Sequence, residues 1–285
     1  MIYAILGPTC SGKSDFAEMI SLKLNCPIIN FDAFQVYKEI DKGTAKPSKE
    51  LLESGRYLMY DFVSLTDEYD VSRYQKDGRI LLDRFKDQNV VLVGGTGLYL
   101  KALLFNYKFE EEDKMPEDFL SDLSNDELYA KLLEIDKNDA LKIGPNNRKR
   151  LIRALYVFET HGKNKSELNN NGKDELIYKD VVFIGVDMPR DILYERINKR
   201  VDMMFEDGLP EEVNNLFAYY GCNRRAFQAI GYKEFNSDLS LDEIKELIKK
   251  NTRNYAKRQM TFFRHQFKDV HWVSSIEDAF KLLEN

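Results

Sequence analysis

The sequence predicts an α/β protein in which a parallel sheet is flanked by helices, with a helical insertion and a helical C-terminal part. Near the start of the chain, an apolar strand passes through a glycine-rich loop into a helix. Further along, two more apolar strands are each followed by a helical pattern, and two long stretches carry helical patterns alone. Strands that alternate with helices form parallel sheets, because each connection returns over one face of the sheet.

The N-terminal elements form a β–α–β unit. Residues 2–6 are apolar and lead through a glycine loop at 7–14 to a helical pattern at 15–24, which a second strand at 27–30 follows. The first strand is too short for the apolar core of a signal peptide and runs straight into the loop. We therefore expect a strand here and no export signal.

Two later strands extend the sheet. Residues 90–93 run into the turn GGTG at 94–97 and then a helix, and residues 181–186 end at Asp187 before another helix. Short apolar runs that glycine or acidic residues terminate are typical of buried strands in parallel sheets.

The remaining chain has helical patterns. Residues 107–179 show no convincing strand, are acidic at first and close with the polar run 169–172, and from residue 191 onward the pattern is almost wholly helical. We expect two domains: a core formed by residues 1–106 and 180–285, and a helical insertion at 107–179.

The composition is that of a globular protein: of 285 residues, 43% are hydrophobic and 32% are charged. No apolar run approaches the roughly 20 residues of a membrane-spanning helix. Cys10, Cys26 and Cys222 have neither the pattern of a disulfide framework nor zinc spacing, and the three histidines lack the spacing of a metal-binding pair. We expect a soluble, cytoplasmic monomer with no membrane partner and no bound transition metal.

The charge is segregated along the chain. A net charge of −6 argues against non-specific binding to nucleic acid. However, acidic residues concentrate in 110–139, whereas 249–268 contains seven Lys or Arg and no acid. The C-terminal helical part could therefore still meet a polyanion.

A phosphate-binding loop joins the first strand to the first helix. The eight residues of this loop are Gly7, Pro8, Thr9, Cys10, Ser11, Gly12, Lys13 and Ser14. They satisfy G-x-x-x-x-G-K-[ST] in the strand-to-helix context that the motif requires. Backbone N–H groups and the helix N-terminus bind a diphosphate or nucleotide such as ATP, Lys13 reaches the phosphates, and Ser14 can hold Mg²⁺ as the cofactor.

The loop alone is also typical of nucleotide kinases, GTPases and ATPases. A hydrolase usually ends a buried strand in an acid that organises Mg²⁺ and water, but the strand at 90–93 ends in glycine. Asp187 could supply such an acid, so a small-molecule or nucleotide kinase remains an alternative. A non-catalytic RNA-binding module is a third hypothesis, which leaves the loop and Asp32 unexplained.

Six short segments follow the loop in order: DAFQVY at 32–37, GTAKP at 43–47, GGTGLY at 94–99, RLIRAL at 150–155, GYKE at 231–234 and TRNYAKRQ at 252–259. With the loop, they resemble the bacterial tRNA dimethylallyltransferase family from end to end. The resemblance implies a P-loop NTPase-like sheet. It also implies transfer of a dimethylallyl group from dimethylallyl diphosphate to N6 of the adenine 3′-adjacent to the anticodon, in tRNAs reading U-starting codons, which gives N6-dimethylallyladenosine.

A few positions depart from the family pattern. Cys10 replaces alanine, Ala33 and Phe34 replace serine and methionine, and Gly144 and Asn147 replace histidine and aspartate. None of these changes removes a charged catalytic candidate. No Cys/His cluster of the kind that extends eukaryotic relatives follows, so we expect a bacterial-type enzyme.

The candidate catalytic residues are Asp32, Thr96, Lys13 and Arg200. Asp32 closes a strand on the same edge of the sheet as the loop, so its carboxylate should face the crevice at the carboxyl ends of the strands. There it could accept the proton that the adenine amine loses. Its alternative is to cap the next helix or to order water around Mg²⁺. Thr96 could reach phosphate or base, or cap a helix, and the resemblance places Arg200 near the diphosphate, with a surface salt bridge as its alternative.

The resemblance also implies contacts with the tRNA anticodon stem-loop. The implied residues are Asp32, Ala33, Phe34, Gln35, Thr96, Lys149, Arg150, Leu151, Ile152, Arg153, Gln228, Tyr232 and Lys233, and the charge pattern of the C-terminal segment adds Arg253, Lys257 and Arg264. Gln35 could read an adenine edge, and Lys149 and Arg153 project from a helix on the side opposite an apolar stripe. Tyr232 could stack on a splayed base or be an ordinary packed tyrosine.

The basic C-terminal segment has two faces. Its apolar stripe is Ala256, Met260, Phe263 and Phe267, and its basic row is Lys250, Arg253, Lys257, Arg264 and Lys268. We expect the stripe to pack on the protein. The row could follow an RNA backbone or simply be a solvated face.

Overall fold

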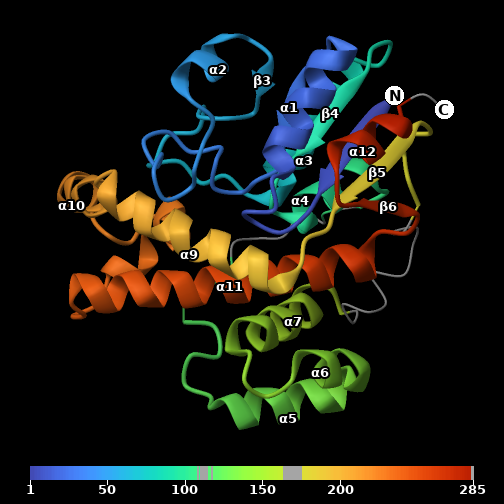
Figure 1. Cartoon of the computed structure of the whole chain (residues 1–285). Coiled ribbons are helices and arrows are strands. Elements are labelled where there is room, and N and C mark those ends of the chain that lie inside the picture. Colours follow the sequence, from blue (N-terminus) through green and yellow to red (C-terminus); the bar gives the residue numbers. More distant parts are fainter. Residues whose placement is uncertain (108, 110–114, 117, 163–174, 284–285) are drawn as a thin grey trace. The chain divides into compact units, whose positions relative to one another are not determined.

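The computed structural model describes residues 1–107, 109, 115–116, 118–162 and 175–283 (Figure 1). The chain divides into two compact units. The first unit comprises Met1–Leu104 and Tyr178–Asn285, and the second comprises Phe105–Ile177.

The first unit is built on a sheet that has six parallel strands within the described residues, in the order β3-β2-β4-β1-β5-β6. The strands are β1 (Ile2–Leu6), β2 (Ile28–Asn30), β3 (Tyr57–Leu58), β4 (Val90–Val93), β5 (Val181–Val186) and β6 (Val270–Val273). This confirms the predicted parallel α/β fold and its four central strands. The edge strands β3 and β6 were not predicted, because β3 has only two residues and β6 is interrupted by an exposed histidine, so neither forms the continuous apolar run that marks a buried strand.

The expectation that the chain is almost wholly helical after residue 191 is wrong at β6. This strand pairs with β5, with Phe183 opposite Val270 and Val186 opposite Val273. Its four residues include a polar histidine that is exposed. A half-exposed strand of four residues gives too weak a pattern to be recognised directly after a long helical pattern.

The helices of the first unit are α1 (Lys13–Leu24), α2 (Lys49–Glu53), α3 (Val71–Arg84), α4 (Gly97–Leu104), α9 (Arg190–Glu206), α10 (Leu209–Tyr220), α11 (Leu241–Gln266) and α12 (Ile276–Lys281), with the short 3₁₀ helices η1 (Arg225–Gln228) and η2 (Lys233–Phe235). Helices α1 and α12 lie together on one face of the sheet (Figure 1). There Ala17, Ile20 and Ala279 join the alternate strand residues Ile5 and Val93 in one core.

Helix α11 is the longest helix of the first unit. A capping box at Ser240 and Glu243 begins it, and it packs against α9 and α4. Its predicted apolar stripe is confirmed at Ala256 and Phe263, which have no exposed surface. Phe267 is buried as well, but it is the residue that terminates the helix.

The second unit contains the helices α5 (Asn125–Ile135), α6 (Lys137–Ile143) and α7 (Arg148–His161). They enclose a small core of their own that includes Leu128, Leu132 and Leu151. Strand-like pairing among its described residues is limited to one antiparallel bridge between Phe105 and Leu176. The polar run predicted at 169–172 lies outside the described residues.

In the part of the chain that the structure describes, no helix is both long and apolar enough to cross a membrane. The same residues contain no group of three or more His, Cys, Asp or Glu side chains placed to hold a metal ion.

Candidate active site

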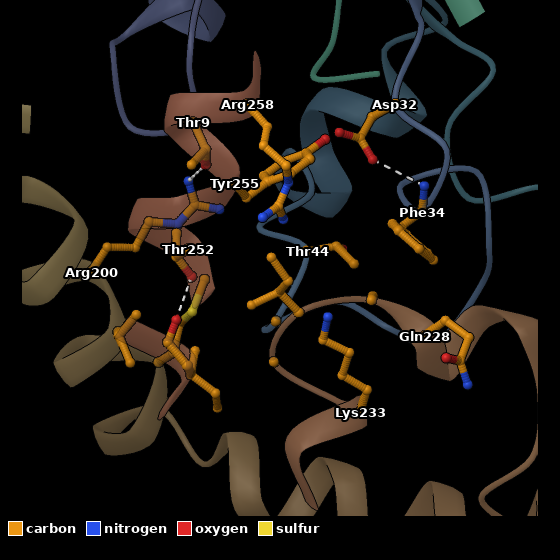
Figure 2. A pocket seen from close by; sticks show the side chains of 17 residues that line it. Thr9, Asp32, Phe34, Thr44, Arg200, Gln228, Lys233, Thr252, Tyr255 and Arg258 are labelled. Atoms are coloured by element: carbon orange, nitrogen blue, oxygen red, sulfur yellow. Dashed lines mark hydrogen bonds between the residues drawn. The ribbon is translucent and has the colours of Figure 1, made fainter. Parts of the chain in front are cut away.

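Two adjoining cavities lie where the parallel strands of the first unit end. Their volumes are about 220 Å³ and about 70 Å³. Both walls include Thr9, Asp32, Thr44, Arg200 and Tyr255. Because parallel strands present their carboxyl ends at one edge, loops from distant parts of the sequence meet here. Figure 2 shows the larger cavity and the side chains that line it.

The phosphate loop has the backbone that its glycines predict. Gly7 has a φ of 155°, and a Cβ there would lie 2.8 Å from the hydroxyl of Ser11 and 3.1 Å from the carbonyl oxygen of Val186. Gly12 begins α1 in the left-handed region, with a φ of 88°. The Ser11 hydroxyl is buried and has no hydrogen-bond partner among the described residues. The loop is therefore tightly folded and retains an unused donor in the Ser11 hydroxyl, as an anion site requires.

Lys13 is a partly buried cation beside this loop. Its ammonium group donates to the carbonyl oxygen of Pro8 at 3.2 Å. Burial lowers the pKa of Lys13 to about 8, Arg200 also lowers it, and Asp32 and Cys10 act in the opposite direction. Lys13 and Ser14 both line the adjoining small cavity. An anion bound there would stabilise the charged form of Lys13 and raise its pKa again.

Asp32 lies two residues beyond β2 and lines both cavities. Its Oδ1 accepts a hydrogen bond from the backbone N–H of Phe34 at 2.9 Å (Figure 2) and another from that of Gln35 at 3.4 Å. Its Oδ2 faces Gly95, where a Cβ would lie only 2.8 Å away. The carboxylate therefore caps the turn that follows it and also faces the cavity; no helix begins at this turn, so Asp32 is not a helix cap.

Thr96 connects two loops. Its hydroxyl accepts the backbone N–H of Ala33 at 3.0 Å, while its carbonyl oxygen accepts the N–H of Tyr99 at the start of α4. The hydroxyl therefore bonds the loop at Ala33 and also lies beside the Tyr255 hydroxyl, and among the described residues it accepts no hydrogen bond from α4. Thr96 is absent from the described lining of both cavities, although Gly94 and Gly95 line the smaller one.

Arg200 comes from α9 and meets the phosphate loop. Its Nη1 lies 3.5 Å from the Thr9 hydroxyl and 3.6 Å from the Cys10 sulfur. Among the described residues it forms no ion pair, and the nearby Asp202 pairs with Lys245 and Lys249 instead. Figure 2 shows its guanidinium group at the cavity, beside Thr9.

Gln35 lines the small cavity and is hydrogen-bonded to the segment at Thr44 and Ala45. Its side-chain amide nitrogen donates to the carbonyl oxygens of Thr44 at 2.9 Å and Ala45 at 3.2 Å. It therefore fixes the segment that brings Thr44 to both cavities. With its N–H donors engaged in this way, the amide nitrogen is not free to read an adenine edge in this arrangement.

The prediction that Tyr232 stacks on a base is wrong, and the packed-tyrosine alternative holds. Tyr232 has no exposed surface. Its hydroxyl donates to Glu212 at 2.5 Å and accepts the backbone N–H of Gly43 at 3.1 Å. Its neighbours Gln228 and Lys233, predicted with it, do line the larger cavity, as Phe34 does.

The basic segment of the second unit requires a second correction. Leu151 is fully buried in the core of that unit, so it cannot contact RNA as predicted. Lys149, Arg150 and Arg153 are exposed on α7, and Ile152 is partly exposed.

The basic row of α11 is only partly available. Arg253 donates to Asn198 at 2.6 Å, and Arg264 lies 3.4 Å from Asp187 and over the ring of Trp272. Lys257 is exposed. Lys268 lies beyond the end of α11 and therefore does not continue the helical row.

Five residues of α11 line the two cavities, and none was predicted as a site residue: Ile248, Thr252, Tyr255, Arg258 and Gln259. Gln259 is buried; its amide nitrogen donates to Gly95 O at 2.9 Å, and its oxygen accepts the N–H of Thr9 at 2.8 Å. The Tyr255 hydroxyl donates to Gly95 O at 3.0 Å, and Arg258 lines the larger cavity. Tyr255 and Gln259 are four residues apart in the TRNYAKRQ segment and so share one helical face, but the prediction for this segment rested on its charged residues.

The acid that would support a kinase does not face the site. The Oδ2 of Asp187 is near Arg264, its Oδ1 accepts the N–H of Met188, and Asp187 is outside the described lining of both cavities.

Comparisons with known proteins agree on one family. A family model described as IPP transferase matches residues 35–266. A tRNA dimethylallyltransferase of Malacoplasma penetrans is 41% identical over 98% of this chain and 94% of its own length. The corresponding protein of Anoxybacillus flavithermus is 38% identical over 98% and 91%.

Solved structures give the same result. A tRNA delta(2)-isopentenylpyrophosphate transferase from Staphylococcus epidermidis has a TM-score of 0.71 and 33% identity, and the match covers 99% of this chain and 97% of that one. A eukaryotic dimethylallyltransferase acting on tRNA has a TM-score of 0.78 and 30% identity, and the match covers 92% of this chain and 69% of that one.

Proposed function

We propose, because the chain belongs to the IPP transferase family of tRNA dimethylallyltransferases, that it transfers a dimethylallyl group from dimethylallyl diphosphate to a tRNA. The acceptor is N6 of the adenine 3′-adjacent to the anticodon, in tRNAs reading U-starting codons. The partner is the anticodon stem-loop, and the enzyme acts as a cytoplasmic monomer. The kinase alternative is not favoured.

The observation that carries this proposal is the joining of a phosphate-loop pocket to a larger, partly apolar cavity. Lys13, Ser14 and Arg200 line the smaller pocket, which suits a diphosphate. The larger cavity has apolar walls from Phe34, Val201, Met204, Ile230 and Ile248. A prenyl chain and a flat base are the kinds of groups that such walls bind.

The reaction breaks the C1–O bond of the donor as the new C1–N6 bond forms, and the electron pair of the broken bond leaves with the diphosphate. Lys13, Arg200 and the loop N–H groups neutralise the charge that develops there. Asp32 accepts the proton that N6 loses, because its carboxylate lies in the wall shared by both cavities.

The residues present fit a magnesium ion at the diphosphate. Ser14 and Asp32 both line the small cavity, and hydroxyl and carboxylate oxygens are ligands that Mg²⁺ prefers. Ser14 would hold the ion, which when bound would add positive charge beside the leaving group.

RNA would meet the cations that surround the larger cavity. Figure 2 shows Arg258 and Lys233 directed toward its interior, together with Arg200. Gln228 lies in the same wall. Ala33 lines neither cavity, but it precedes the lining residue Phe34 and is bonded to Thr96. The exposed cations of α7 and Lys257 would bind backbone phosphates outside the cavity.

The test is mass spectrometry of an unmodified anticodon stem-loop after incubation with the protein, Mg²⁺ and dimethylallyl diphosphate. A gain of one C5H8 unit on the target adenine is expected. An RNA of unchanged mass, with ATP-dependent phosphorylation of a small acceptor at about 1 s⁻¹ or faster, would support a kinase instead.

A further inference from the structure

Tyr60 is a lining residue of the small cavity that neither the motifs nor the mechanism above uses. It follows β3, whose parallel pairing with β2 carries it to the same sheet edge as the phosphate loop. There it shares the wall of the small cavity with Lys13, Ser14 and Asp32.

The hydroxyl of Tyr60 has no hydrogen-bond partner within the described part of the chain, unlike those of several other tyrosines in this unit. The hydroxyls of Tyr69, Tyr74 and Tyr255 donate to Asp77, Asn30 O and Gly95 O respectively. A phenol beside a polar cavity without such an acceptor is available to a ligand in that cavity.

The backbone on both sides of Tyr60 is strained. Met59 has a φ of 62° and Asp61 a φ of 52°, a region that non-glycine residues rarely occupy. Tertiary contacts maintain both conformations. The Asn30 side chain donates to Met59 O at 3.0 Å, and the buried ammonium group of Lys46 lies 2.5 Å from the Asp61 carboxylate. Strain maintained in this way is a feature of sites that need a side chain held in advance.

The electrostatic surroundings make this phenol a donor. Burial raises the pKa of Tyr60, and the neighbouring Tyr57 and Asp32 raise it further. The hydroxyl therefore keeps its proton throughout the range in which proteins work and can donate it to an anionic oxygen.

We propose that Tyr60 is a further catalytic residue, whose hydroxyl donates a hydrogen bond to the diphosphate in the small cavity. The inference rests on the proposed function. As the C1–O bond breaks, negative charge grows on the departing diphosphate, and this hydrogen bond strengthens. The phenol keeps its proton, and the proton from N6 still goes to Asp32.

The test compares Tyr60→Phe with a matched control, Tyr57→Phe. Tyr57 forms an edge-on ring contact with Tyr60 at 5.8 Å but does not line either cavity among the described residues. Calorimetry measures the affinity for inorganic pyrophosphate with Mg²⁺, single-turnover kinetics measure prenyl transfer at saturating donor, and melting temperatures show that both variants are folded.

We expect Tyr60→Phe to bind pyrophosphate about 10-fold more weakly, as the loss of one hydrogen bond to a charged group predicts. Its transfer rate falls about 10-fold or more, while Tyr57→Phe resembles the wild type. Unchanged pyrophosphate affinity in Tyr60→Phe overturns the role, even if transfer slows. A wild type that neither binds pyrophosphate nor transfers the prenyl group overturns the proposed function itself.

Discussion

At the scale of single residues, Asp32 shows how one side chain can be both structural and chemical. Its Oδ1 is bonded to two backbone N–H groups, and its Oδ2 is directed toward Gly95 and the cavity wall. The first set of contacts fixes the orientation of the second oxygen. Preorganisation of this kind lowers the cost of placing a base beside its substrate.

Asp32→Asn is expected to lower the single-turnover rate of prenyl transfer by about 10²-fold or more, the usual effect of removing a positioned base. The amide oxygen of the variant can still accept hydrogen bonds from the N–H groups of Phe34 and Gln35. The affinities for dimethylallyl diphosphate and for RNA should therefore stay near those of the wild type. Rapid-quench kinetics and equilibrium binding on the same preparation test this. A near-normal rate would exclude Asp32 as the base.

Lys13 gives the binding of dimethylallyl diphosphate a pH dependence. In the free protein its pKa is lowered from 10.5 to about 8, so below pH 8 it is charged, and above pH 8 it must take up a proton to meet the diphosphate. Affinity should therefore fall as pH rises above 8, by up to about 10-fold per unit. Calorimetry across this range tests it, and Lys13→Ala should bind weakly with a flat profile above pH 8. An equally steep fall in that variant would assign the titration to another group.

At the scale of elements, α11 joins the core to the site. Its buried face carries Ala256 and Phe263 into the core, and on the same helix Gln259 links the phosphate loop to the loop at Gly95. The other side of the helix is basic, but Arg253 and Arg264 already have partners in the protein. Lys257 is therefore the better probe of RNA binding on this helix.

Lys257→Glu is expected to weaken tRNA binding and to reduce the slope of log affinity against log salt by about 0.7 to 0.9, the value for one lost phosphate contact. Affinity for dimethylallyl diphosphate should not change. Filter binding at several salt concentrations measures the slope. Lys76→Glu, the same charge change at an exposed position of α3, is the control. An unaltered slope would make this side of α11 an ordinary solvated face.

At the scale of the whole molecule, the two units differ in what they contribute. Every described residue that lines the two cavities belongs to the first unit. The second unit has its own core and presents Lys149, Arg150 and Arg153 on α7. We infer that the first unit binds the prenyl donor, and that the second contributes to binding the RNA.

Reversing two charges on α7, with Lys149→Glu and Arg150→Glu, should raise the KM for the anticodon stem-loop by about 10-fold or more, because two phosphate contacts are lost. Pyrophosphate affinity should be unchanged. Lys137→Glu with Lys142→Glu, two exposed positions on α6, supplies the matched control. An equal effect of both pairs would indicate general electrostatics in place of a defined RNA surface.

The sequence alone determined the parts of this protein that depend on local pattern. Apolar runs marked β1, β2, β4 and β5, and the loop that contains Lys13 and Ser14 was recognisable because its chemistry resides in consecutive residues. Asp32 could be placed at the site because residues that follow parallel strands share one edge.

Only the tertiary structure decided the features that depend on distant contacts. The burial of Tyr232 against Gly43, the bridge that Gln259 forms to Thr9 and the edge strand β6 each join residues far apart in the sequence. The position of Tyr60 depends in the same way on Asn30 and Lys46. Local periodicity carries no information on such pairs, because packing and long-range hydrogen bonds, not intrinsic propensity, fix where these side chains lie.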